Sequence, residues 1–177
     1  MKELSKLMSL ILRHEADRIG VPLDPEGFVS IDVLLAAVRT QRPTTTREDI
    51  RRVVETVEPA KQRFTIVDDD IRANYGHSLD RRIVHEPATP PDILFHGTHG
   101  RAIAVILADG LRPMSRQYVH LTPDPDLARQ VGSRRGAPTL VRVDAAAAAR
   151  DGVAFYRANP AFWLADFVPA RYLRADG

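Results

Sequence analysis

The chain of 177 residues contains no cysteine, which excludes a disulfide framework and a thiolate metal site. It has no apolar run near the roughly 20 residues that span a bilayer and no signal-peptide pattern, so we expect a cytoplasmic protein without a membrane partner. Of its 25 lysine and arginine residues only three are lysines. Arginine matches phosphate oxygens two at a time, which favours a phosphate or nucleic-acid partner; a GC-rich genome that favours arginine codons explains the enrichment equally well.

The first part of the sequence predicts three helices and a hairpin. Apolar residues from Leu4 to Leu12 recur at three- and four-residue spacing, which predicts an amphipathic helix over about residues 2–18. Ser30 can cap a second helix that ends near Arg39. The acidic turn before Ile50 begins a third helix. Two short strands are expected next, at 63–67 and 71–74, on either side of an acidic turn. Together, the three helices and this hairpin indicate a winged-helix lobe.

The second part of the sequence follows a proline-rich linker. Three prolines fall within residues 86–92, so we place a boundary near residue 88. Beyond it, short apolar runs alternate with short helical patterns, which predicts an α+β lobe rather than a doubly wound sheet. The expected strands are 93–95, 118–121, 139–143 and 162–164, and the expected helices are roughly 100–108, 124–131 and 145–150.

Polar side chains gather on the first helix and after the hairpin. A projection at 100° per residue places Lys2, Lys6, Ser9 and Arg13 along one polar face, with His14 at the edge of the apolar stripe. Phosphate contact and a solvated cationic face both explain this pattern. The glycine turn at residues 74–78 can cradle an anion, and it is equally consistent with ordinary hairpin punctuation.

Two further motifs stand in the second part. His96-Gly97-Thr98 leaves a predicted strand and can bind a sugar or a pyrophosphate. The loop at residues 131–136 carries an arginine pair, which would bind an anion or stand exposed. The sequence has no Walker lysine loop and no dinucleotide Gly-x-Gly-x-x-Gly pattern. His96 and His99 lack a carboxylate at a convincing spacing, so we expect no metal.

Nine motifs in order make the chain similar to the tRNA 2′-phosphotransferases, NAD⁺-dependent enzymes of tRNA splicing that remove a splice-junction 2′-phosphate. The resemblance covers nearly the whole chain. It is carried by Leu4-Ser5-Lys6 with Leu12-Arg13-His14, Arg63-Phe64, Ile71-Arg72-Ala73-Asn74 with Gly76-His77-Ser78, His96-Gly97-Thr98, Gly110-Leu111 with Met114-Ser115-Arg116, Val119-His120-Leu121-Thr122, Val131-Gly132 with Arg134 and Gly136, Asp151-Gly152, and Trp163-Leu164 before Val168-Pro169.

The resemblance implies a winged-helix RNA-binding lobe over residues 1–87 and a NAD-binding lobe of the ADP-ribosyltransferase type over residues 88–177. It implies an enzyme that consumes NAD and acts on tRNA-like RNA bearing a 2′-phosphate, and we expect a monomer without a metal. The implied catalytic residues are Arg13, His14, Arg72 and Arg134. The implied NAD contacts are His96, Gly97, Thr98, Ser115, Arg116 and His120, and the implied RNA contacts are Lys6, Asn74, His77, Ser78 and Arg135.

The implied reaction has two steps. The RNA 2′-phosphate attacks the anomeric carbon of the nicotinamide riboside and expels nicotinamide, and the ribose 2″-hydroxyl then attacks phosphorus. The products are 2′-hydroxyl RNA and ADP-ribose 1″,2″-cyclic phosphate. The sequence departs from the family pattern at Tyr75, where glutamine is usual, at Ala16, where proline is frequent, and at Arg135, where histidine is frequent. None of these departures removes a member of the catalytic set.

Two other functions fit the same residues. One is an ADP-ribosyltransferase that caps terminal phosphates of RNA or DNA and retains ADP-ribose on the product. The other is a non-catalytic winged-helix nucleic-acid binder whose second lobe senses a nucleotide. It would bind nucleic acid regardless of NAD⁺ and release no nicotinamide.

Overall fold

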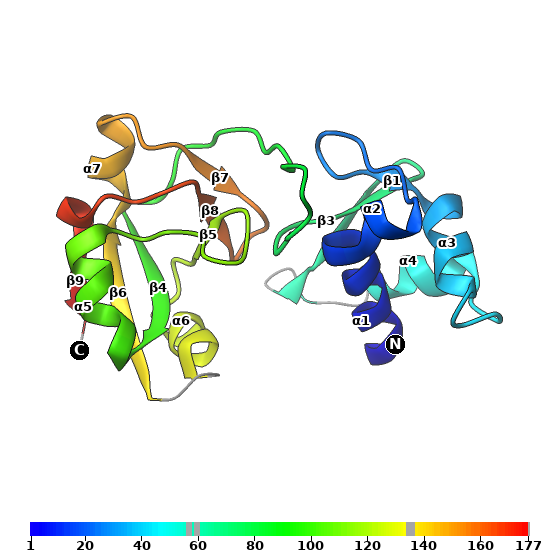
Figure 1. Cartoon of the computed structure of the whole chain (residues 1–177), viewed down its shortest axis with the longest axis horizontal. Helices are drawn as coiled ribbons and strands as arrows, with labels where there is room; N and C mark the ends of the chain where they lie inside the picture. The colour runs from blue at the N-terminus through cyan, green and yellow to red at the C-terminus, as the bar shows by residue number, and fades with distance from the viewer. Residues whose placement is uncertain (56–57, 59–60, 134–136, 177) are drawn as a thin grey trace. The chain divides into compact units, whose positions relative to one another are not determined.

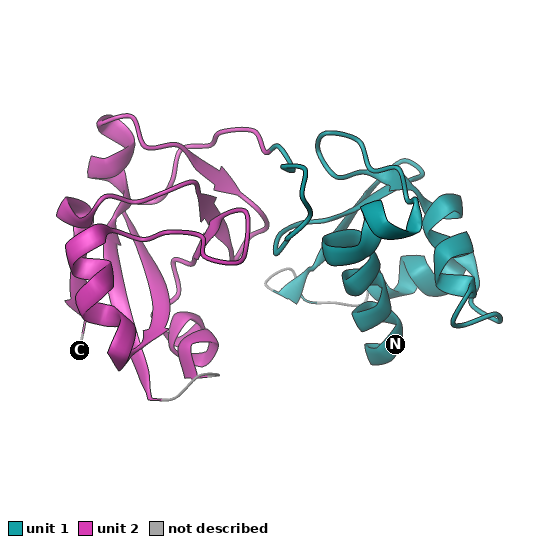
Figure 2. Ribbon diagram, in the orientation of Figure 1, with its two compact units in different colours: residues 1–84 teal, residues 85–177 magenta. Residues whose placement is uncertain are grey.

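The computed structural model of the protein describes residues 1–55, 58, 61–133 and 137–176. The chain divides into two compact units, Met1–Val84 and His85–Gly177 (Figure 2). Each unit has its own cluster of buried apolar side chains.

The N-terminal helical segment of unit 1 changes its winding midway. It consists of α1 (Lys2–Leu10), a π-helical turn η1 (Ile11–Glu15) and α2 (Ala16–Ile19), which follow one another without a break (Figure 1). The helical extent agrees with the predicted residues 2–18, whereas the π-helical turn was not predicted. The segment ends at Gly20, whose left-handed φ of 73° suits glycine.

The next two helices begin at side-chain caps, the first of which was predicted at Ser30. Ser30 Oγ accepts a hydrogen bond from the Val33 amide at the start of α3 (Ile31–Arg39). At the start of α4 (Arg47–Glu55), the Thr46 hydroxyl accepts from the Asp49 amide while the Asp49 carboxylate accepts from the Thr46 amide. This reciprocal pair is a capping box, and it confirms the predicted acidic first turn.

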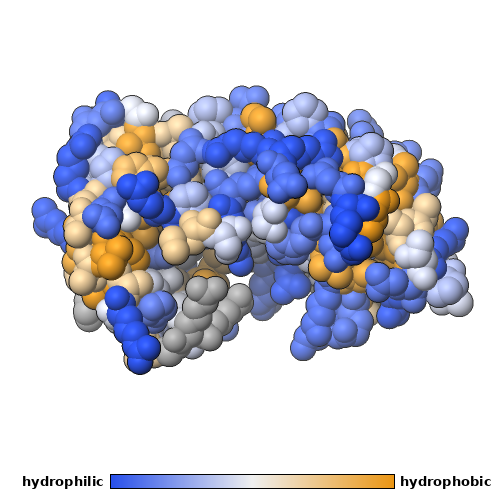
Figure 3. Space-filling view, in the orientation of Figure 1, coloured by the Kyte–Doolittle hydropathy of each residue, from blue (hydrophilic) through white to orange (hydrophobic). Residues whose placement is uncertain are grey.

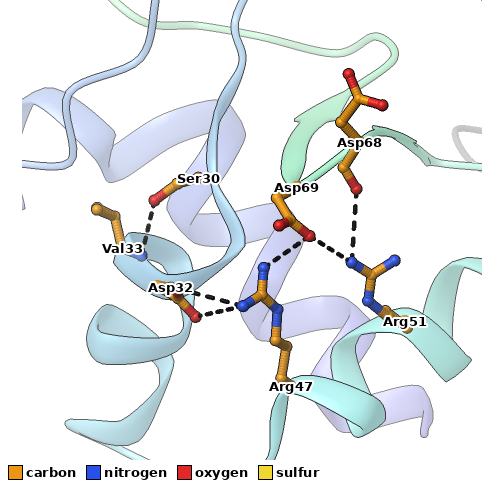
Figure 4. Close-up of polar contacts among 7 residues, drawn as sticks. All are labelled: Ser30, Asp32, Val33, Arg47, Arg51, Asp68 and Asp69. Atoms are coloured by element: carbon orange, nitrogen blue, oxygen red, sulfur yellow. Dashed lines mark hydrogen bonds and ion pairs between the residues drawn. The ribbon is translucent and has the colours of Figure 1, made fainter.

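The sheet of unit 1 has the order β1-β3-β2, with both pairs antiparallel. The predicted hairpin is confirmed as β2 (Phe64–Val67) and β3 (Asp70–Ala73), while the short β1 (Val29–Ser30) was not predicted. The acidic turn between β2 and β3 is joined to α4, because Asp69 forms ion pairs with Arg47 at 2.8 Å and Arg51 at 2.7 Å (Figure 4).

Unit 2 contains two small antiparallel sheets. One has the order β4-β6-β9, formed by β4 (Ile93–His99), β6 (Pro138–Asp144) and β9 (Leu173–Asp176). The other has the order β5-β8-β7, formed by β5 (Val119–Leu121), β8 (Trp163–Ala165) and β7 (Phe155–Arg157). Two backbone hydrogen bonds between Phe95 and Thr122, of 2.7 and 3.0 Å, join the sheets.

Among its described residues, unit 2 also contains three helices and a 3₁₀ turn. The helices α5 (Gly100–Asp109), α6 (Pro125–Gly132) and α7 (Ala145–Arg150) confirm the three predicted ones, and Ala170–Tyr172 form the 3₁₀ turn. All described strand pairs are antiparallel, which bears out a mixed α/β lobe that is not doubly wound. Helix α5 buries none of its residues, and apolar surface is visible over it in Figure 3.

Strand β4 is longer than predicted because it pairs with β6 over its whole length, and α6 packs closely on it. The strand was expected to end at Phe95, yet it continues through His96, Gly97 and Thr98. A Cβ placed on Gly97 would lie 1.8 Å from the Ala128 carbonyl oxygen of α6. Glycine therefore lets the backbones of β4 and α6 touch.

Among the described residues, no helix is long and apolar enough to cross a membrane.

We expect Gly97→Ala to lower the free energy of unfolding of unit 2 by about 3 kcal/mol, because the added methyl group must push α6 off β4. Trp163, the only tryptophan, lies in unit 2, so its fluorescence during urea unfolding reports this unit. Gly100→Ala is the matched control, since its Cβ would have only Thr139 Oγ1 nearby, at 3.8 Å. A value for Gly97→Ala within about 0.5 kcal/mol of the wild type would contradict this account of the contact.

Candidate active site

Arg13 and His14 lie on the π-helical turn η1, and Ser78 holds both of them. The Ser78 amide donates a hydrogen bond of 2.9 Å to the Arg13 carbonyl, and its Oγ lies 2.7 Å from His14 Nδ1. Such π-helical turns occur frequently at functional sites because they redirect side chains locally. This contact joins two motifs that are 64 residues apart in the sequence.

The turn at residues 74–78 also positions the Arg13 side chain. Gly76 has a φ of 89°, and a Cβ there would lie 3.5 Å from Arg13 Cδ and from Nη1. The Arg13 guanidinium lies over the Tyr75 ring, 5.0 Å from its centroid. Tyr75, a departure from the family pattern, thus forms a cation–π contact with a predicted catalytic residue.

Arg72 lies on β3 opposite Thr65, and β3 packs against η1. Its guanidinium lies over the Phe28 ring at 4.6 Å and makes a long hydrogen bond of 3.5 Å to the Glu26 carbonyl. Within the described part of the protein, the buried Nε of Arg72 has no hydrogen-bond partner. Burial lowers the pKa of Arg72, although Glu26 and Asp24 oppose that effect, and arginine keeps its charge near neutral pH.

Two predicted RNA contacts are buried inside unit 1. Asn74 is 1% exposed; its amide group accepts from Thr65 Oγ1 at 2.7 Å and donates to the Gln62 carbonyl at 3.3 Å. His77 is 2% exposed. Both side chains therefore stabilise the turn that carries Gly76 and Ser78. Their contact with RNA stays a prediction.

Lys6 lies on the exposed side of α1. It forms an ion pair of 2.9 Å with Glu3, and this hydrogen-bonded contact lowers the pKa of that carboxyl. A separate hollow of about 280 Å³ opens near the start of α1, and none of the predicted site residues that the structure describes lines it. Its lining residues are Met1, Lys2, Ser5, Val53, Val54, Lys61, Arg63 and Phe64.

In unit 2 the structure brings together three of the predicted NAD contacts. His96 Nδ1 lies 2.9 Å from the His120 carbonyl oxygen, and Arg116 Nη1 lies 3.4 Å from His120 Nε2. Burial lowers the pKa of His96, and its hydrogen bond to His120 opposes this effect. A neutral His96 that donates through Nδ1 presents Nε2 as an acceptor.

The other predicted NAD contacts differ in their surroundings. Thr98 is buried in β4, and Ser115 is exposed beside Arg116 in the turn before β5. The side of Gly97 that a side chain would occupy faces the α6 backbone, so the close approach that glycine permits here is between two protein segments. That packing accounts for the glycine without a ligand.

Two predicted residues, Arg134 and Arg135, lie outside the described residues. Among the residues that the structure does describe, no group of three histidine, aspartate or glutamate side chains could hold a metal ion.

Sequence reasoning missed Phe28 and the Glu26 carbonyl, which contact Arg72. They lie in a loop with proline and glycine, where neither spacing nor motif marks a functional residue. The π-helical turn left no sequence signal either. The observed arrangement supplies two fixed guanidinium groups and an oriented imidazole within unit 1, a combination suited to binding and protonating an oxyanion.

Comparison with known proteins identifies the family. The model of the "RNA 2′-phosphotransferase, Tpt1 / KptA family" matches residues 1–167. A probable RNA 2′-phosphotransferase of Streptomyces coelicolor is 44% identical over 172 residues, covering 97% of this chain and 93% of that protein. One from Hahella chejuensis is 43% identical over 175 residues, covering 98% and 93%. The chain therefore belongs to the RNA 2′-phosphotransferase family.

Proposed function

We propose that this protein transfers an internal 2′-phosphate from RNA to NAD⁺, giving 2′-hydroxyl RNA, nicotinamide and ADP-ribose 1″,2″-cyclic phosphate. Family membership supports the transferase chemistry on RNA. The observation that carries the residue assignment is the Ser78 contact with both Arg13 and His14 on η1. Arg134 completes the proposed catalytic set on the strength of its motif.

The proposed role of Arg13 and Arg72 is to bind the phosphate oxygens. Each guanidinium rests on an aromatic ring, which fixes its plane while the N–H groups point along that plane. Donors that are already in place stabilise charge that moves among phosphoryl oxygens without a reorganisation cost. The buried Nε of Arg72 supports this role, since a phosphate oxygen would satisfy it.

The proposed role of His14 is to protonate the RNA oxygen that leaves phosphorus. In this proposal Ser78 Oγ holds the ring through Nδ1, and Nε2 faces the reacting group. A phosphate dianion is already nucleophilic, and the first step therefore needs no general base.

The proposed site for NAD⁺ lies in unit 2. The donor set fits a dinucleotide, because Arg116 offers a guanidinium for a pyrophosphate and the His96 and His120 rings offer hydrogen bonds for a ribose or an amide. When bound, NAD⁺ supplies an electrophilic anomeric carbon and a neighbouring ribose hydroxyl. Gly97 would contribute by allowing α6 to support β4 beneath His96 and Thr98.

We assign winged-helix character and RNA binding to the N-terminal lobe, and an ADP-ribosyltransferase-like fold to the C-terminal lobe. The succession of a helix, a short strand, two helices and a two-stranded hairpin in the sheet order β1-β3-β2 supports the first assignment. Two joined antiparallel sheets that carry the His96 and His120 cluster support the second.

The direct test is an assay with purified protein, NAD⁺ and an oligonucleotide that carries one internal 2′-phosphate. We expect nicotinamide release together with loss of the 2′-phosphate, and a parallel 5′-phosphorylated oligonucleotide detects end capping by retained ADP-ribose. Loss of a preorganised donor lowers the rate by a factor on the order of 10²–10³. We therefore expect the reaction rate of Arg13→Ala, of Arg72→Ala and of Arg134→Ala to fall by that factor.

The matched control in this assay is Arg42→Ala, which removes an exposed arginine of the same unit. It should retain the wild-type rate. Full activity in the three site variants would refute the assignment of the arginines, and absence of nicotinamide release from the folded wild type would refute the reaction.

Ser78 offers a second test, because its proposed role is to orient His14. We expect Ser78→Ala to lower kcat by about 10-fold, part of the 10²–10⁴ that a general acid contributes, with little change in KM. Ser78→Thr keeps the hydroxyl and should restore most of kcat. Equal loss in both variants, or a change confined to KM, would show that the hydroxyl does not act through His14.

A further inference from the structure

The two faces of the β4-β6-β9 sheet differ in character. One face packs on the apolar core, and the other carries arginine side chains. In β6, Val141 and Val143 are fully buried and Arg142, between them, is exposed. The register places Arg142 between Phe95 of β4 and Arg174 of β9. Helix α6 packs on this same face at Gly97, two residues further along β4. Arg142 and Arg174, which we call the arginine row, therefore lie next to α6, on a part of this face that α6 does not cover.

A hollow of about 150 Å³ opens at this row, and we call it the arginine hollow. Three guanidinium groups and one carboxylate border it, which leaves a formal charge of about +2 at neutral pH. The lining residues are Ile93, Arg142, Asp144, Arg171, Tyr172 and Arg174.

The single carboxylate of the arginine hollow already has a structural partner. Asp144 Oδ1 accepts a hydrogen bond of 3.0 Å from the Ala147 amide and caps α7. Arg171 lies over the Tyr172 ring at 4.6 Å, which fixes its plane. Within the described ranges, neither Arg142 nor Arg174 has a carboxylate at ion-pair distance.

The direct pairing of Arg142 with Arg174 needs a physical explanation. Like charges on directly opposite positions of an antiparallel pair repel each other, and such a pair destabilises a sheet. An anion between them would turn this repulsion into two charge-assisted contacts. Three guanidinium groups suit a tetrahedral oxyanion, which offers at least three acceptor oxygens, better than a carboxylate, which offers two.

We propose that the arginine hollow binds a phosphate group. None of the described residues assigned to catalysis or to NAD⁺ lines it, and the inference does not depend on the proposed reaction. Two sources have this chemistry: a backbone phosphate of RNA, and a small phosphate such as a mononucleotide.

The test measures binding to the whole protein without NAD⁺, so that no turnover occurs. One arm uses a short single-stranded RNA that lacks a 2′-phosphate, and the other uses inorganic phosphate and AMP. The variants are Arg142→Gln and Arg174→Gln. Arg157→Gln is the control, because it removes an exposed arginine from the other sheet of the same unit. Circular dichroism confirms that each variant is folded.

We expect Kd to rise about 10-fold in the two site variants, in at least one arm, and to stay unchanged in Arg157→Gln. If RNA is the source, the salt dependence of log K for RNA should become shallower by about 0.7 for each phosphate that the variant no longer neutralises. If a small phosphate is the source, only the second arm changes. If the Kd values of the site variants match that of Arg157→Gln in both arms, the proposal is overturned. That result would not bear on the proposed reaction, which the activity assay tests separately.

A second readout uses stability. Inorganic phosphate should raise the Tm of the wild type and of Arg157→Gln more than that of Arg142→Gln, because a ligand stabilises only the state that binds it. Arg142→Lys keeps the charge and removes the two-pronged hydrogen bonding, so it should recover only part of the shift. Equal phosphate-induced shifts in all four proteins would count against the site.

Discussion

The hydrogen bonds from Ser78 to the π-helical turn are the constraint on which the arrangement of unit 1 depends. One residue contacts the Arg13 backbone through its amide and the His14 ring through its hydroxyl. Both contacts require Ser78 to lie against η1, and the buried Asn74 and His77 hold the turn in that place. A shift of the 74–78 turn would therefore displace the Arg13 carbonyl contact and the imidazole contact together.

An analogous constraint in unit 2 is the close approach of α6 to β4. The Gly97 and Gly132 positions leave no room for side chains, since a Cβ on Gly132 would lie 2.8 Å from the Thr98 carbonyl oxygen. This contact sets the position of β4 at His96, while the hydrogen bonds between Phe95 and Thr122 tie β4 to the end of β5. Together they bring His96 to the His120 carbonyl. The two glycines therefore allow α6 to pack on β4, and the polar side chains beside them can contact a ligand.

Much of the helical structure was predictable, because caps and apolar spacing are local signals. The Ser30 cap and the Thr46–Asp49 box illustrate this. The π-helical turn was not predictable, since Met8, Leu12 and Ala16 keep their four-residue spacing through it. Strands β1 and β7 are too short for an alternating pattern, and tertiary pairing creates them. Motifs predicted Arg13, His14 and Ser78 as site residues, whereas Phe28 lies in a loop and is found only from its contact with Arg72.

Aromatic rings, rather than close carboxylates, give Arg72 its position, and a ring also supports Arg13. An ion pair would occupy the edge of a guanidinium and offset its charge, whereas a ring contacts the face and leaves the in-plane donors directed outward. Glu26 and Asp24 influence Arg72 through space, yet its hydrogen bond to this loop goes to the Glu26 carbonyl and not to a carboxylate. The Tyr75 ring likewise contacts the guanidinium of Arg13. At the position where the resemblance leads us to expect a polar glutamine, Tyr75 therefore gives Arg13, an arginine proposed for catalysis, an aromatic face instead.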